Sequence, residues 1–146
     1  MSGTVQLATA KRRLALVWFA GATPLFLFVL ALSLTSPGIG APAWAWFLPT
    51  VMPNLSLIVG VYVADARAGQ QADRPVDRFT FMMTAYLSGF YLLCIATLFL
   101  THPFYAQGLQ AWLTASQPWL AALQGLTALA MGAFYVQPAV APEGGT

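Results

Sequence analysis

The residue types that most often catalyse reactions are scarce in this sequence. Its 146 residues include one histidine, one cysteine, six basic and four acidic residues. A catalytic zinc needs three protein ligands, which the single His102 cannot provide. Cys94 lies inside a long apolar run, where a thiol stays protonated and inert. No GxGxxG or P-loop pattern occurs. We therefore expect no enzyme activity, no metal site and no bound cofactor.

The uncharged polar residues of one apolar segment are the remaining candidates for a site. The segment reads Leu-Pro-Thr-Val-Met-Pro-Asn-Leu-Ser from residue 48 to residue 56. Pro49 suits the first turn of a helix, whereas Pro53 has no N–H for the carbonyl of Pro49 and should bend the helix. Asn54 beside this bend suits a gate, a pore or a ligand pocket, or else a hydrogen bond to Gln124 or Thr127 of a neighbouring helix. The candidate kink or pore-lining residues are Pro49, Thr50, Pro53, Asn54 and Ser56.

Composition indicates what must surround these residues. Hydrophobic residues make up 59% of the chain and charged residues 7%, with a mean hydropathy of +0.71. A soluble domain carries about 25% charged residues, so a surface made from this sequence would aggregate in water. We expect the surface to face a lipid bilayer. Nucleic-acid binding is excluded, because one lysine and five arginines do not form a basic face.

Four apolar segments are long enough to cross a membrane as helices. They run from about 14 to 35, 46 to 64, 79 to 100 and 118 to 136, and about 20 residues cross a hydrocarbon core. The sequence thus predicts an all-α, four-helix transmembrane domain over residues 14–136, between an N-terminal segment, 1–13, and a tail, 137–146. Between the last two spans, apolar residues at near-helical spacing predict a short helix in the outer interface. They are Phe104, Tyr105, Leu109, Trp112 and Leu113.

The charged residues predict how the helices are oriented. All ten lie before the first span, between the second and third, or in the tail. By the positive-inside rule, both termini and the middle loop are cytoplasmic. A bacterial inner membrane, crossed several times, is the expected location. In the middle loop, Arg67, Arg74 and Arg78 either anchor at lipid headgroups or dock a cytoplasmic partner.

Small residues predict where helices approach closely. The fourth span carries Ala121, Gly125, Ala128 and Gly132 at spacings of four, three and four, while Gly60 and Gly89 lie on the second and third spans. Such residues allow close backbone contact in lipid. The expected use is packing within one bundle, and the alternative is association of the fourth span with a second copy.

Three functions fit these features. We expect a non-enzymatic subunit that acts through helix–helix contacts with another membrane or cytoplasmic protein, or with itself as a homo-oligomer. The first alternative is a self-associating pore or membrane-permeabilising effector, for which Asn54 and its polar neighbours would line the path. The second is a carrier of a neutral or lipophilic compound, which requires a pocket near Pro53 and Asn54.

Overall fold

The computed structural model describes residues 4–68, 75–101 and 108–135, and four long helices account for nearly all of them. The helices are α1 (Leu7–Thr35), α2 (Pro37–Ala68), α3 (Arg78–Thr101) and α4 (Leu109–Tyr135). The predicted all-α class is therefore confirmed. Three of them, α1, α2 and α3, are long and apolar enough to cross a membrane, which supports a membrane-embedded protein. The fourth, α4, is less apolar and is not among them.

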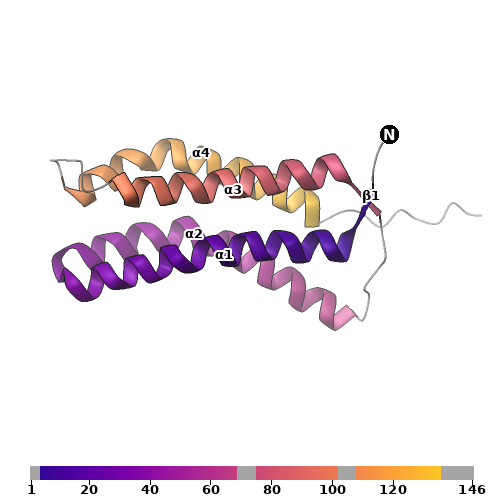
Figure 1. Ribbon diagram of the computed structural model, residues 1–146, viewed down its shortest axis with the longest axis horizontal. Coiled ribbons are helices and arrows are strands. Elements are labelled where there is room, and N and C mark those ends of the chain that lie inside the picture. The colour runs from indigo at the N-terminus through magenta and orange to yellow at the C-terminus, as the bar shows by residue number, and fades with distance from the viewer. Residues whose placement is uncertain (1–3, 69–74, 102–107, 136–146) are drawn as a thin grey trace, which may run out of the picture.

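The helices form a four-cornered bundle. Helix α1 packs against α2 and α3, and α4 packs against the same two helices, so α1 and α4 are diagonally opposite, as are α2 and α3. Figure 1 shows α1 and α2 as one antiparallel pair and α3 and α4 as the other. The second half of α2 bends away from α1 and leaves the bundle.

The turn between α1 and α2 is much shorter than the sequence predicts. Residues 36–45 were expected to form a connector, but α2 already begins at Pro37, because Ser36 alone makes the turn. The carbonyl of Ser36 accepts hydrogen bonds from the N–H groups of Ile39 and Gly40, at 2.9 and 3.1 Å. A Cβ atom at Gly40 would lie 2.7 Å from the Cα of Ser33, so this tight turn requires glycine there.

The separate interfacial helix predicted before the fourth span is also absent from the described residues. Gly108 has a φ of +80°, which favours glycine, and α4 begins at the next residue. Leu109, Trp112 and Leu113 therefore belong to the first turns of α4, so the prediction was wrong for these three residues. Phe104 and Tyr105 lie outside the described residues.

A short ribbon, which the sequence did not predict, joins the start of the chain to the segment before α3. Strands β1 (Thr4–Gln6) and β2 (Pro75–Asp77) pair antiparallel, with Val5 opposite Val76. Val76 is buried. Because β1 leads directly into α1 and β2 into α3, these two helices start at the same end of the bundle. We call it the ribbon end.

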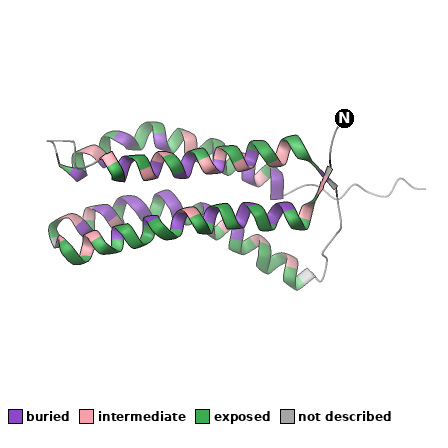
Figure 2. Cartoon of the chain, viewed as in Figure 1, coloured by how far each residue is buried: buried purple, intermediate pink, exposed green. Residues whose placement is uncertain are grey.

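Burial follows the pattern of a bundle that faces lipid. Figure 2 shows buried residues along the inner faces of the helices and exposed residues outside. The largest buried side chains are aromatic, among them Trp18, Tyr91 and Phe99. Large apolar side chains also cover the outside: Leu129 is 72% exposed and Leu34 77%. Water does not tolerate an apolar surface of this extent, whereas a bilayer does.

Candidate functional site

The bend of α2 is where helices exchange polar contacts in the middle of the bundle. Pro49 and Pro53 both lie inside α2, so Pro49 is not in the first turn as predicted. Since Pro53 has no N–H, the carbonyl of Pro49 lacks its usual donor within the helix. The side chain of Gln124 on α4 supplies one, with Nε2 3.3 Å from that oxygen. Gln124 was expected as a partner of Asn54, but the bond that the structure gives it is to Pro49.

A second contact reaches the same bend from α3. The hydroxyl of Tyr91 crosses the bundle diagonally and donates to the carbonyl of Thr50 at 2.8 Å. The hydroxyl of Thr50 donates to the carbonyl of Trp46, one turn earlier in its own helix, at 2.6 Å. Tyr91 is fully buried. Nothing in the sequence marked Tyr91 as a site residue beyond its phenol in the middle of an apolar span.

The five candidate residues of the bend do not share one surface. Asn54 is 1% exposed and Thr50 is 8% exposed, so both point into the bundle. Pro49, Pro53 and Ser56 are exposed on the outside of α2. The amide nitrogen of Asn54 has no hydrogen-bond partner among the described residues. The bend therefore places two polar side chains in the core and three residues against the surroundings.

The small residues singled out for packing have open space beside them. A Cβ atom added at any of the four glycines would meet no atom within 4 Å of it, and the two alanines are exposed. The packing role of these residues stays a prediction. Helices α1 and α3 approach closely at Gly21, where a Cβ would lie 2.7 Å from Leu92 Cδ1. No spacing in the sequence marked Gly21. Of the six, four are exposed, namely Gly60, Ala121, Gly125 and Ala128, and two are half-buried, namely Gly89 and Gly132.

An ion pair joins three helices at the ribbon end. Lys11 Nζ of α1 lies 2.7 Å from Asp65 Oδ2 of α2 and 5.9 Å from the ring centroid of Tyr135 on α4. The Lys11 side chain is 11% exposed, so its methylene groups pack inside while the ammonium stays paired. Two of the predicted docking arginines, Arg67 and Arg78, are exposed near this end. The third, Arg74, lies outside the described residues.

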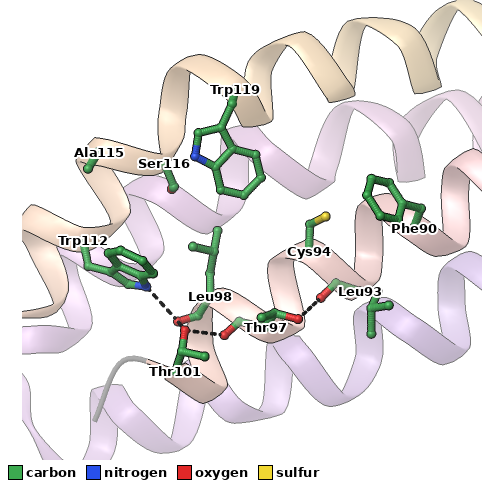
Figure 3. Close-up of a pocket in the computed structure, with 10 residues that line it drawn as sticks. All are labelled: Phe90, Leu93, Cys94, Thr97, Leu98, Thr101, Trp112, Ala115, Ser116 and Trp119. Atoms are coloured by element: carbon green, nitrogen blue, oxygen red, sulfur yellow. Dashed lines mark hydrogen bonds between the residues drawn. The ribbon is translucent and has the colours of Figure 1, made fainter. Parts of the chain in front are cut away.

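Apolar clefts between the helices could hold a neutral molecule. The largest of the three that we describe, about 530 Å³, lies between α1 and α3 and is lined by apolar side chains together with Gly21 and Gly89. A second, of about 340 Å³, lies between α3 and α4 and includes Cys94 (Figure 3). The third, of about 220 Å³, lies between α1 and α2 beside the bend, but neither Pro53 nor Asn54 lines it.

Several polar groups around the second cleft donate hydrogen bonds within the protein. The Trp112 indole N–H donates to the carbonyl of Leu98 at 3.2 Å, and the hydroxyls of Thr97 and Thr101 donate to carbonyls one turn earlier in α3 (Figure 3). No charged residue lines it. Within the described part of the chain, no group of three or more His, Cys, Asp or Glu side chains could hold a metal. His102 lies outside that part.

Comparisons with models of protein families, with curated proteins and with solved structures give no match for this chain. What it does must therefore be inferred from its own residues and contacts.

Proposed function

We propose that this chain is a four-span protein of a bacterial inner membrane, with both termini cytoplasmic, that acts as a non-catalytic subunit of a larger membrane assembly. The ribbon supports this topology, because it holds the start of α1 and the start of α3 at one end of the bundle. The contact of Lys11 with Tyr135 brings the end of α4 to the same end. If the helices cross the bilayer, a chain whose first helix starts and whose last helix ends at the same end crosses it an even number of times.

The packing of α4 supports a membrane depth like that of the other helices. It packs along both α2 and α3, so if those two cross the bilayer, α4 lies at the same depth. Its glutamines lower its hydropathy, but the side chain of Gln124 donates a hydrogen bond to the carbonyl of Pro49 on α2. A polar group satisfied in this way is tolerated in hydrocarbon.

The observation that carries the subunit function is the outward orientation of small residues on α4. Gly125 and Gly132 lie one above the other beside the exposed Ala121 and Ala128, in a surface with no contact inside the bundle. Small residues at this spacing let a second helix approach closely, and close packing is what holds helices together in lipid. The stripe therefore suits contact with another transmembrane helix.

The test uses glycines whose replacement leaves the bundle intact. Gly125→Leu fills the stripe, while the matched control Gly38→Leu fills equally open space at the start of α2. We expect the wild type and the control to migrate above the 15.6 kDa chain in native electrophoresis of mildly solubilised membranes, and Gly125→Leu to migrate as a monomer. Retention of the larger species by Gly125→Leu, or its absence in the wild type, would contradict the proposal.

The large apolar cleft favours a second candidate, a carrier of a lipophilic compound. Gly89 lines this cleft between α1 and α3. The carrier function predicts that Gly89→Leu lowers the retention of a pyrene-labelled fatty acid by the purified protein, while Gly125→Leu leaves it unchanged. A pore is supported less well, because Thr50 and Asn54 point into the bundle whereas Ser56 faces outwards.

A further inference from the structure

Six buried polar atoms lack a hydrogen-bond partner among the described residues. Three of them come from three different helices: the indole nitrogen of Trp18 on α1, the amide nitrogen of Asn54 on α2 and the hydroxyl oxygen of Ser88 on α3. None of the three residues is more than 1% exposed. A buried polar group with no partner costs about 1 to 3 kcal/mol. Three of them in a membrane bundle therefore need a physical explanation.

The three atoms belong to one level of the bundle. Helices α2 and α3 run in opposite directions, and the bond from the Tyr91 hydroxyl to the Thr50 carbonyl fixes their register. Asn54 comes one turn after Thr50, and Ser88 comes three residues before Tyr91. Both are thus displaced from that bond towards the ribbon end.

Trp18 comes to the same level from the third helix. Its ring centroid lies 6.0 Å from that of Tyr91, and the two rings are tilted by 43°. The Tyr91 side chain therefore contacts both the ring of Trp18 and the bend of α2, at the level of Asn54 and Ser88. We call this level of the bundle the central polar site and define it by Trp18, Asn54, Ser88 and the Tyr91 hydroxyl.

We propose that the central polar site binds internal water. The site offers two N–H donors, from Trp18 and Asn54, and the hydroxyl of Ser88, and all three are neutral. A water molecule can accept from both N–H groups and donate to the hydroxyl oxygen. A buried water makes about three hydrogen bonds in proteins, which matches this set of atoms. None of the four residues lines one of the three clefts described above, so the site is separate from them.

The bound water links three helices beside the bend of α2. It gives the amide of Asn54 a partner and connects it to α1 and α3 without direct side-chain contact. The site lies inside the bundle, whereas the proposed subunit contact uses the outside of α4. The two proposals can therefore fail separately.

Replacing Ser88 by alanine tests the site, because it removes one hydroxyl and little else. The matched control is Ser56→Ala in α2, whose serine is exposed. If water bridges the site, Ser88→Ala raises the unfolding equilibrium constant in SDS titrations about threefold to tenfold, and Ser56→Ala leaves it unchanged. In an Asn54→Leu background the effect of Ser88→Ala should shrink towards none, because the water has already lost its amide partner.

The opposite result would overturn the proposal. If the atoms are dry and unpaired, Ser88→Ala lowers the unfolding constant, since it removes an unsatisfied group. An unchanged constant, or an equal loss in both backgrounds, also refutes a shared water. Should Asn54→Leu fail to fold, water-edited solid-state NMR of the wild type in bilayers decides the question. A water cross-peak to the side-chain amide of Asn54 supports the site, and a missing one refutes it.

Discussion

Replacing Gln124 by leucine should weaken the fold, because it removes the donor that Pro53 makes necessary. Its Nε2 lies 3.3 Å from the Pro49 oxygen, slightly beyond the usual range of 2.7 to 3.2 Å. Hydrogen bonds between membrane helices contribute about 0.6 kcal/mol on average and about 1.7 kcal/mol at most. The long distance favours the lower half of that range. We expect Gln124→Leu to reduce the free energy of unfolding by about 0.5 to 1 kcal/mol.

The assay is reversible unfolding of the purified chain in mixed micelles of increasing SDS content, followed by the fluorescence of its five tryptophans. The control is Gln117→Leu, which replaces an exposed glutamine on the same helix and should leave the free energy of unfolding unchanged.

A second background sharpens this test. In Pro53→Ala, residue 53 regains an N–H that can bond to the Pro49 carbonyl. The effect of Gln124→Leu should then fall to about half or less. The link between Gln124 and the bend would be refuted if Gln124→Leu lowered the free energy of unfolding equally with and without Pro53. It would also be refuted if Gln117→Leu lowered it as much.

Three further outcomes follow from contacts elsewhere in the bundle. Tyr91→Phe removes a buried 2.8 Å hydrogen bond and should lower the free energy of unfolding by about 1 to 1.5 kcal/mol; no change in the same SDS titration would contradict this. Lys11→Gln and Asp65→Asn should each cost about 0.5 kcal/mol, since Asp65 is 39% exposed, and the double variant should cost little more than either. Gly21→Leu should destabilise the monomer by about 1 to 3 kcal/mol because of its close approach to α3, whereas Gly125→Leu should not, and thermal unfolding in detergent compares the two.

The existence of the helices could be predicted from the sequence, because each depends mainly on the composition of its own segment. A run of about 20 apolar residues without charge is stable in lipid as a helix, because its backbone groups must bond within the segment. Accordingly α1 ends and α3 begins and ends within one residue of the predicted bounds, although α1 begins earlier, at Leu7. The start of α2 was missed because Pro42 and the glycines around it read as a loop. A single residue, Ser36, completes the turn, and helix packing then extends α2 through that segment.

The candidate site was predicted only in part, because composition identifies polar and small residues but not the direction in which they point. The carbonyl freed by Pro53 could be foreseen from covalent structure, and the structure gives it a donor. Tyr91 could not be foreseen, since its role depends on α3 lying diagonally across from α2. The glycines were expected inside for the same reason: their spacing indicates a face, and only the tertiary arrangement decides whether that face is turned inwards.

The bend of α2 marks a change in how this helix packs. Between Leu55 and Arg67 only Ile58 is buried. The second half of α2 is mostly exposed (Figure 2). Gly60 lies in this half, with open space where a Cβ would be. The proline at the bend frees the backbone carbonyl of Pro49, and Gln124 of α4 donates a hydrogen bond to it. Pro53 thus explains why a carbonyl of α2 takes its donor from a neighbouring helix, which a sequence without that proline would not require.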